Sequence, residues 1–254
     1  MAFSNVFGGY FVIHSETLNP ERAEKFTSEL KRVGIEKFKL ICPLEISEYD
    51  PRLKHFGVGG HKLLSLIDCF QRAVEIARKN SLHSIVIFED DIKFRKGFDA
   101  YWAELEPLLE QCDWDIIALH RTKTDSSGVI IENLFRKIEF VQIKHNTLTH
   151  CVVLRASAYD KFYEALEYCI HMGYPADFFY GVFTYDGLGK IFATTKNITG
   201  QSGGFASGLQ DGRVRLSYFS SEFQCYRNRI EWYCISVLRA LLSTLRNFSK
   251  KRPL

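Results

Sequence analysis

Short apolar runs alternate with longer amphipathic stretches through the first half of the chain, and this alternation constrains the fold more than any other feature. The runs span residues 10–14, 37–41, 84–88 and 114–120. Strands that are buried on both faces carry such nearly continuous apolar sequences, and helices between them cover a largely parallel sheet. The pattern therefore predicts an α/β domain with a doubly wound first half. Short strands over 128–153 and a helix over about 156–170 predict a mixed second half.

Two helices have clear sequence signals. Asn19 is expected to cap the first helix, with Pro20 as its opening residue and Gly34 near its end. A longer helix is predicted over 61–79, where apolar residues recur at helical spacing. The polar segment 45–60 that precedes it is predicted to be a surface loop.

The distribution of charge separates a body from a tail. The chain has 254 residues and a net charge of +3, but residues 222–254 hold seven Lys or Arg and two Glu. The tail therefore carries +5 and residues 1–221 carry −2. We expect one domain over 1–221 and a basic segment over 222–254. A body without basic excess argues against nucleic acid as a partner, whereas the tail suits an anionic surface.

The cysteines and the apolar runs bear on the compartment. Seven cysteines lie far apart without a C-x-x-C pair, which favours free thiols in a reducing environment over disulfides or a zinc site. No signal peptide is evident, and no apolar run approaches the roughly 20 residues that span a bilayer. A cytoplasmic location is expected.

Three adjacent carboxylates, Glu89, Asp90 and Asp91, end the apolar run 84–88. In open α/β sheets, ligands bind beyond the carboxyl ends of the strands. If the backbone stays extended, Glu89 and Asp91 point to the same side and offer hard oxygen ligands for Mn²⁺ or Mg²⁺. Such an ion bridges to phosphate oxygens, and a nucleotide sugar is a natural ligand. Alternatively, the acids cap the next turn or pair with Lys93 and Arg95.

The order of several segments carries a resemblance. "YFVIHSETLNPER", "GVGGHKLLSLIDCFQRAVEIARKN", "SIVIFEDDIKF", "THCVVLRASAYDKF" and "YPADFF" follow one another over roughly 10–186. This order resembles glycosyltransferase family 25, the lipopolysaccharide-type and collagen-type galactosyltransferases. The "GVGGHKLLSL" stretch departs from the family's usual "GCxxSH". The resemblance implies a GT-A-like fold, a mixed sheet flanked by helices, and metal-dependent, inverting sugar transfer, often from UDP-galactose.

The resemblance and the strand ends together suggest roles on the donor side. Asp91 is expected to be the metal ligand with Glu89, while Glu89 and Asp90 also contact the donor. His14 and Arg22 follow the first strand and are expected to face the nucleotide, with Arg22 suited to a phosphate. Arg22 could equally be an ordinary residue on the surface of a helix.

The transfer also needs a base and an acceptor site. Asp177 matches the family's "PvD" position and is favoured as the base. Asp186 in "FTYDGLG" is the rival, and either residue could instead cap a turn. His150 and, less so, His145 are candidate acceptor contacts, against an ordinary structural histidine. Gln201, in the loop-like stretch "GQSGG", is expected to contact the donor when that loop closes, unless it is plain surface.

The basic tail has a helical pattern of its own. Apolar residues recur at helical spacing over 230–248, and Lys250, Lys251 and Arg252 follow. One reading is an interfacial helix that holds the protein on the cytoplasmic face of the inner membrane, near a lipid-linked glycan acceptor such as lipopolysaccharide. The other is a helix packed on the domain.

Two rival functions belong to other classes. A glycosyltransferase-like domain could bind a nucleotide sugar or a protein partner without turnover. Asp91 and Lys93 also form a D-x-K pattern of the kind found in metal-dependent nucleases. The nuclease needs a basic groove for nucleic acid, which residues 1–221 do not supply in charge.

Overall fold

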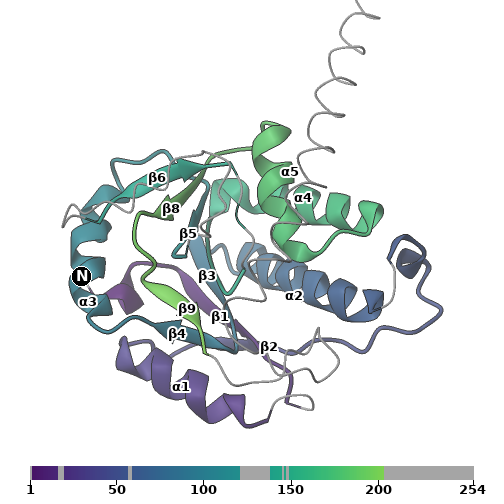
Figure 1. Cartoon of the computed structure of the whole chain (residues 1–254), viewed down its shortest axis with the longest axis horizontal. Helices are drawn as coiled ribbons and strands as arrows, with labels where there is room; N and C mark the ends of the chain where they lie inside the picture. Colours follow the sequence, from purple (N-terminus) through teal and green to yellow (C-terminus); the bar gives the residue numbers. More distant parts are fainter. Residues whose placement is uncertain are drawn as a thin grey trace, which may run out of the picture. The chain divides into compact units, whose positions relative to one another are not determined.

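A seven-stranded mixed sheet organises the molecule (Figure 1). The computed structural model describes residues 2–16, 20–56, 59–120, 138–144, 146 and 149–202. In spatial order the strands are β2 (Lys39–Ile41), β1 (Gly9–Ile13), β3 (Ser84–Glu89), β7 (Cys151–Arg155), β5 (Ile116–Ala118), β8 (Ile191–Thr194) and β6 (Phe140–Ile143). Strand β1 is parallel to β2 and β3, and β5 is parallel to β8. Strands β7 and β6 are antiparallel to their neighbours.

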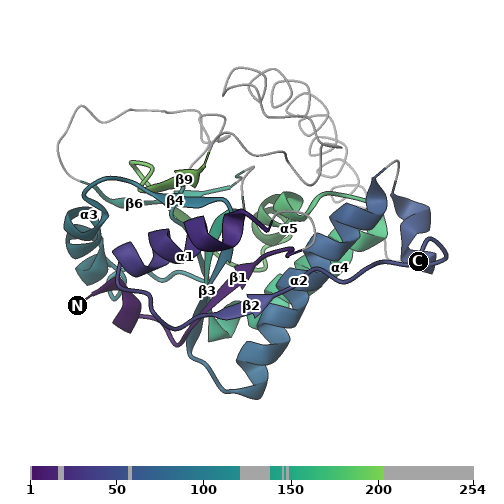
Figure 2. The ribbon, with the colours of Figure 1, turned by 90° about the horizontal axis from the view of Figure 1, so that it is seen from below.

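Helices cover both faces of the sheet (Figures 1 and 2). They are α1 (Arg22–Arg32), α2 (Gly60–Lys79), α3 (Phe98–Leu105), α4 (Tyr159–Met172) and α5 (Phe179–Tyr185). Short 3₁₀ turns are η1 (Phe3–Asn5), η2 (Pro51–His55), η3 (Glu106–Leu108), η4 (Ala156–Ala158) and η5 (Ala176–Phe178). Helices α2, α4 and α5 pack on one face, and α1 and α3 pack on the other.

The alternation of side chains along β3 builds a core on each face. Ile85 and Ile87 join the apolar cluster of α2, α4 and α5, whereas Val86 and Phe88 join that of α1 and α3. All four side chains are completely buried. A strand buried on both sides needs apolar residues at every position, which explains why the run 84–88 is uninterrupted.

A small second sheet follows directly after the three carboxylates. Strand β4 (Ile92–Phe94) pairs antiparallel with β9 (Thr199–Gln201). Helix α1 lies along the other edge of β4: Glu29 Oε2 accepts from the Phe94 amide at 3.0 Å, and Arg32 Nη2 donates to the Phe94 carbonyl at 2.8 Å. The turn between β3 and β4 is therefore anchored to the main sheet on one side and to the small sheet on the other.

The fold class predicted from the sequence is confirmed: the sheet is mixed, flanked by helices, and consistent with a GT-A-like fold. The helix predicted over 61–79 is α2, which begins at Gly60 after a left-handed Gly59 with φ of 83°. The run 37–41 forms a strand only over Lys39–Ile41. Two predicted features, the Asn19 cap and the segment 222–254, lie outside the described residues.

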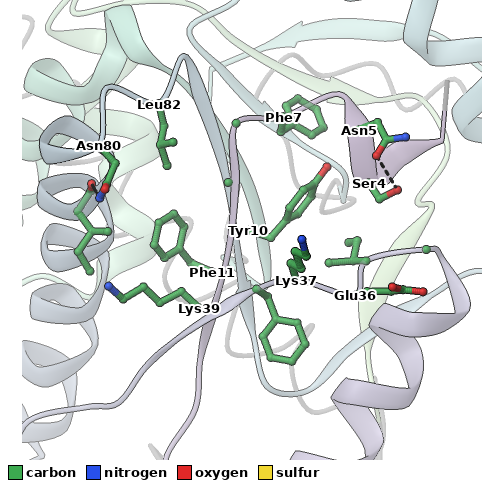
Figure 3. A pocket seen from close by; sticks show the side chains of 16 residues that line it. Ser4, Asn5, Phe7, Tyr10, Phe11, Glu36, Lys37, Lys39, Asn80 and Leu82 are labelled. Carbon is green, nitrogen blue, oxygen red and sulfur yellow. Dashed lines mark hydrogen bonds between the residues drawn. The ribbon is translucent and has the colours of Figure 1, made fainter.

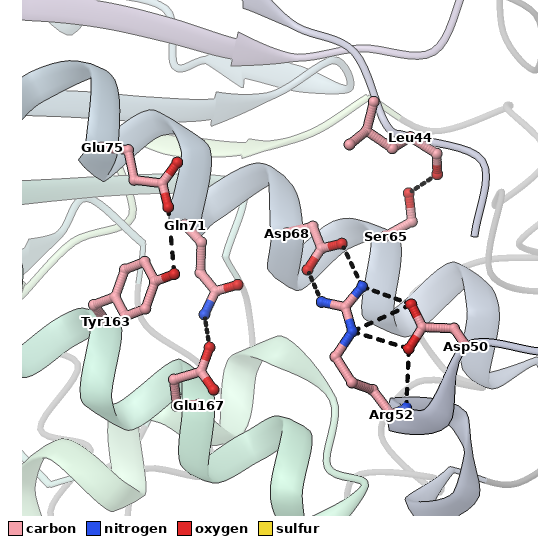
Figure 4. Close-up of polar contacts among 9 residues, drawn as sticks. All are labelled: Leu44, Asp50, Arg52, Ser65, Asp68, Gln71, Glu75, Tyr163 and Glu167. Carbon is pink, nitrogen blue, oxygen red and sulfur yellow. Dashed lines mark hydrogen bonds and ion pairs between the residues drawn. The ribbon is translucent and has the colours of Figure 1, made fainter. Parts of the chain in front are cut away.

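The segment 45–60 is less irregular than predicted, because it contains η2. Asp50 caps this turn, and Arg52 bridges the carboxylates of Asp50 and Asp68 on α2 (Figure 4). At the other end of η2, a Cβ at Gly173 would come within 1.7 Å of the His55 carbonyl oxygen. The turn is thus seated on both α2 and α4, and Gly173 cannot be replaced without displacing it.

The "GQSGG" stretch also differs from its prediction as a loop. Residues Gly200 and Gln201 belong to β9, with Gln201 paired opposite Ile92. Residues 203 and 204 lie outside the described part of the chain. Among the helices of the described residues, none is both long enough and apolar enough to cross a membrane.

Candidate functional site

Polar residues gather at one edge of the main sheet, where the parallel strands end. His14 follows β1, Glu89 ends β3, and His120 lies two residues after β5. Strand β7 runs the other way, so the residues before it, Thr149 and His150, reach the same edge. Ligands of open α/β sheets bind at such edges, which makes this one the candidate site.

Asp90 lies inside the protein and is held by two basic side chains. Its two carboxylate oxygens lie 2.9 Å from His14 Nδ1 and 2.6 Å from Arg22 Nη1. Asp90 is 8% exposed, His14 1% and Arg22 6%. Arg22 is therefore not a surface residue of α1. Asp90, Arg22 and His14 were predicted to contact the donor. In the structure their side chains contact one another in the interior instead of lining an open surface.

The alternative pairing with Lys93 and Arg95 is not what the structure shows for Asp90. Lys93 is exposed on β4, opposite Gly200. The Arg95 guanidinium lies 5.6 Å from the centre of the Tyr101 ring. The partners of Asp90 are instead His14 and Arg22, which are 76 and 68 positions away in the sequence.

Glu89 is half-buried at the end of β3 and held in place by the segment before β7. Thr149 Oγ1 donates to Glu89 Oε1 at 2.5 Å, and the Glu89 amide donates to the His150 carbonyl at 3.2 Å. Burial raises the pKa of Glu89 well above its usual range, and the charges of Asp91, Asp90 and Asp177 add to this rise. A cation placed among these carboxylates would relieve both costs.

Asp91 is half-buried in the turn between β3 and β4. Its carbonyl accepts from the Ser202 amide at 2.7 Å, one residue beyond β9. Asp90 and Asp91 form a turn, so the extended backbone assumed for Glu89 and Asp91 ends at Glu89. The two carboxylates still lie within electrostatic reach of each other, since the charge of Asp91 contributes to the raised pKa of Glu89.

Asp177 approaches the same carboxylates from η5. It is half-buried, and burial raises its pKa to about 7, although its own amide and that of Phe178 donate to it. The charge of Asp177 also raises the pKa of Glu89, so the two carboxylates lie within electrostatic reach of each other. A carboxyl group with a pKa near 7 has the property that a general base needs at neutral pH.

Asp186 lies elsewhere. It is exposed at the C-cap of α5, where its amide donates to the Val182 carbonyl. Partial burial raises the pKa of Asp186, and the charge that adds to this is that of Glu164 on α4. Of the two candidates for the base, only Asp177 contributes to the raised pKa of Glu89.

The histidines at the sheet edge are packed inside. The rings of His120 and His150 meet edge to face with centroids 4.5 Å apart, and His120 Nδ1 lies 3.2 Å from the Thr199 carbonyl. His150 is completely buried and His120 is 7% exposed, and burial lowers the pKa of His120. A direct contact of His150 with an acceptor would require its ring to be uncovered, so the structural alternative fits better. His145 lies outside the described residues.

Three polar residues of this region, Thr149, Asn146 and Tyr180, were not predicted from the sequence as part of the site. Thr149 holds Glu89, and the buried Asn146 donates to the His120 carbonyl at 3.0 Å. Tyr180 is completely buried, bonds to Asn146, and has its pKa raised by burial and by the charges of Asp177 and Glu89. Their polar side chains next to buried strands could have suggested a site, but their partners are set by the fold.

The carboxylates suit a divalent ion that is shared with a ligand. The described residues hold no group of three or more His, Cys, Asp or Glu side chains arranged around one ion. Mg²⁺ and similar ions are usually held by one or two carboxylates, with the remaining positions taken by water and substrate phosphates. Glu89 and Asp91 fit that pattern, since their mutual repulsion calls for a counter-charge.

A pocket of about 720 Å³ lies at the opposite edge of the sheet (Figure 3). Its walls come from β1 and the start of β2, the segments before these strands, and the end of α2 with Leu82, and they include Tyr10, Phe11 and Lys39. The carboxylate turn ends β3, so the pocket is separated from the candidate site by the length of that strand. It does not belong to the site described above.

Comparison with known proteins adds little to this geometry. No family model and no curated protein matches the sequence. Among solved structures, the chain is similar to a glycosyltransferase involved in the glycosylation of the major capsid of PBCV-1, with 11% identity, a TM-score of 0.34, and 63% of this chain and 65% of that chain covered. It is also similar to A197 from STIV, with 8% identity, a TM-score of 0.33, and 72% and 79% covered.

The first of these structures is a glycosyltransferase, and the match spans less than two thirds of that protein's length. A likeness of this degree carries no argument about activity, and family 25 stays a resemblance of sequence segments. The chemistry must be inferred from the residues at the sheet edge.

Proposed function

We propose that the chain is a metal-dependent glycosyltransferase that moves a sugar from a nucleotide-sugar donor to a hydroxyl group of a glycan. The observation that supports this proposal is the position of Glu89 and Asp91 where β3 ends at the carboxyl edge of the sheet, with Asp177 within electrostatic reach of Glu89. Two of these residues come from one turn, and the third comes from a separate segment 86 positions after Asp91. A metal-dependent, inverting sugar transfer from a diphosphate uses this combination of a cation site and a nearby base.

Glu89 and Asp91 would hold Mn²⁺ or Mg²⁺, which neutralises the charge that develops on a diphosphate leaving group. Thr149 keeps the Glu89 carboxylate oriented through the hydroxyl contact at 2.5 Å. Ser202 fixes the backbone of Asp91 from the side of β9. The site would thus present two carboxylates of defined position to the donor.

Asp177 would accept the proton of the acceptor hydroxyl as that oxygen attacks the anomeric carbon. Its pKa of about 7 lets it be ionised above neutral pH and still bind the transferred proton. One base acting on the acceptor, opposite the leaving group, gives inversion at the anomeric carbon. Asp186, which faces Glu164, is the alternative base only if the acceptor binds on the side of α4.

The identities of donor and acceptor come from the sequence resemblance alone. It supports UDP-galactose as the donor and a lipooligosaccharide or lipopolysaccharide as the acceptor. The net charge of +5 over 222–254 supports contact with an anionic leaflet, and hence work on the cytoplasmic face of the inner membrane. Gln201 would contact the donor from β9, next to the carboxylate turn.

A panel of UDP-, GDP- and CMP-sugars with Mn²⁺ tests the proposal. The full chain should hydrolyse or transfer from one donor, and EDTA should abolish that activity. Asp91→Ala should lose it, whereas Asp113→Ala, which removes the exposed partner of Lys190, should keep it. If the protein binds a nucleotide sugar but turns none over, it is a binding domain instead of an enzyme, and the proposal is rejected.

A further inference from the structure

The buried contacts of Asp90 form a triad that joins three separate segments of the chain. His14 follows β1, Arg22 is the first residue of α1, and Asp90 lies in the turn between β3 and β4. We propose that Asp90 binds neither metal nor donor but is a positioning residue, which acts with His14 and Arg22 to hold Glu89 and Asp91 at the metal site. This inference rests on the proposed function.

The position of the triad argues against a ligand role for Asp90. Each of its carboxylate oxygens already has a charged or polar partner within 2.9 Å, and its side chain is 9% exposed. Glu89 and Asp91, on either side of it, are more exposed than Asp90. The middle residue of the turn therefore points inward while its two neighbours border the site.

A buried ion pair is poor evidence for stability, because desolvation offsets most of the attraction between the charges. Buried polar groups can instead select one arrangement of the chain. Here the arrangement is that of the three consecutive carboxylates at the end of β3, and the triad holds the middle one. Removing one partner would leave an uncompensated charge and let the turn shift.

Helix α1 holds the turn and the following strand at two places. Its first residue, Arg22, bonds to Asp90, and ten positions later Arg32 bonds to the Phe94 carbonyl, with Glu29 on the Phe94 amide. Glu89 is held by its backbone contact with His150 and by the Thr149 hydroxyl, and Asp91 has a backbone contact with Ser202. Every residue of the turn is therefore tied to a different segment, and Asp90 is the one tied by its side chain to α1.

Of the two ring nitrogens of His14, only Nδ1 contributes to the triad. Its Nδ1 meets Asp90, while its Nε2 is buried and has no hydrogen-bond partner among the described residues. An asparagine side chain places an amide nitrogen near the position of Nδ1, whereas a glutamine reaches toward the position of Nε2. His14→Asn should therefore preserve the site and His14→Gln should impair it.

A double-mutant cycle on Mn²⁺ affinity tests the proposal with the full chain. We expect Asp90→Asn and Arg22→Gln each to weaken Mn²⁺ binding about 10- to 100-fold, the usual cost of losing a residue that orients a ligand. The double variant should lose no more than the worse single variant, because both changes break one contact. Saturating Mn²⁺ should restore most of kcat. A double variant whose loss of Mn²⁺ affinity equals the product of the two single losses would overturn the proposal.

Asp68→Asn is the matched control, since it breaks an Arg–carboxylate pair of the same kind between α2 and η2 (Figure 4). It should lower Tm and leave Mn²⁺ affinity unchanged. Arg22→Lys keeps the charge with a single donor group and covers the case in which Arg22→Gln does not fold. Equal loss of Mn²⁺ affinity in Asp68→Asn would show a general effect of stability and would reject the positioning role.

The outcomes separate this inference from the proposed function. Multiplying losses in an active transferase would overturn the inference and leave the function standing. Coupled losses of Mn²⁺ affinity in a chain that transfers no sugar would support the inference and reject the function. A wild-type chain that binds no Mn²⁺ would reject both.

Discussion

Two groups of carboxylates in this protein show opposite electrostatics. On η2 and α2, Arg52 lies between Asp50 and Asp68, and its hydrogen bonds lower the pKa of Asp50 (Figure 4). At the carboxyl edge of the sheet, burial and mutual repulsion raise the pKa of Glu89, and burial raises that of Asp177 to about 7. In the first group, both carboxylates are paired with a guanidinium of the same chain. In the second group, a bound cation would remove the cost of keeping buried carboxylates charged side by side, and this difference makes it the candidate site.

The largest effect is expected from a substitution in the carboxylate group at the edge of the sheet. Asp91→Asn should reduce sugar transfer by about 10³-fold or more, since it removes a charge that stabilises the leaving group through the metal. Tm should stay the same or rise, because a repulsive carboxylate is lost. Transfer assays and thermal melts measure both. Retained activity would show that Asp91 is no ligand.

A smaller loss should distinguish the two candidate bases. Asp177→Asn should lower kcat by about 100-fold or more with little change in KM, because a general base acts mainly in the transition state. Asp186→Asn should stay near the wild-type rate. In the wild type, kcat/KM should rise as pH passes through about 7, where Asp177 loses its proton. The reverse ranking of the two variants would assign the base to Asp186.

Metal binding should stabilise the folded protein, and this gain should depend on the carboxylates of the sheet edge and not on those of α2. At a hundred times its Kd, Mn²⁺ should add about 2.7 kcal/mol to the free energy of unfolding. Glu89→Gln should lose most of this gain, and Asp68→Asn should keep it. Thermal melts with and without Mn²⁺ measure the difference. An equal gain in both variants would place the ion elsewhere.

The smallest effect is a dependence of stability on pH with opposite signs in the two groups. The pKa of Asp177 is higher in the folded chain than in the unfolded one, so its ionisation destabilises the fold as pH rises from about 4 to about 7. Asp177→Asn should therefore stabilise the protein at pH 8 by about 1–2 kcal/mol, after allowance for its partial exposure, and not at pH 4.

Asp50 gives the converse control. Its pKa is lower in the folded chain, so its contribution to stability is present above its unfolded pKa and is lost as pH falls below that value. Asp50→Asn should be slightly destabilising at pH 7, and the difference should vanish in acid. Urea melts at several pH values measure both variants. If both substitutions changed the free energy of unfolding in the same direction at neutral pH, the two groups would not differ in their electrostatics.

The sequence predicted the elements in which apolar residues repeat at the spacing of a strand or a helix. The run 84–88 predicted β3, and the helical spacing over 61–79 predicted α2, because burial on a strand or a helix repeats at a fixed interval. The carboxylates at the end of β3 could be placed at a sheet edge for the same reason. Asp177 was proposed from a resemblance, and the structure brings it to Glu89.

Contacts between distant segments could not be predicted in this way. Nothing local in Arg22 or His14 indicates that they face Asp90, about 70 positions away. Strand β9 is short and contains Gly200, so its pairing with β4 depends on the partner strand rather than on its own propensity. The positions of Thr149, Asn146 and Tyr180 around Glu89 likewise depend on how β7 and α5 pack.

The side chains of α1 on Phe94 have a consequence for solubility. A strand at the border of a two-stranded sheet presents free amide and carbonyl groups that can recruit a strand from another molecule. Glu29 and Arg32 occupy both groups of Phe94, so the helix takes the place that a foreign strand would fill. Loss of either side chain would open a template for aggregation.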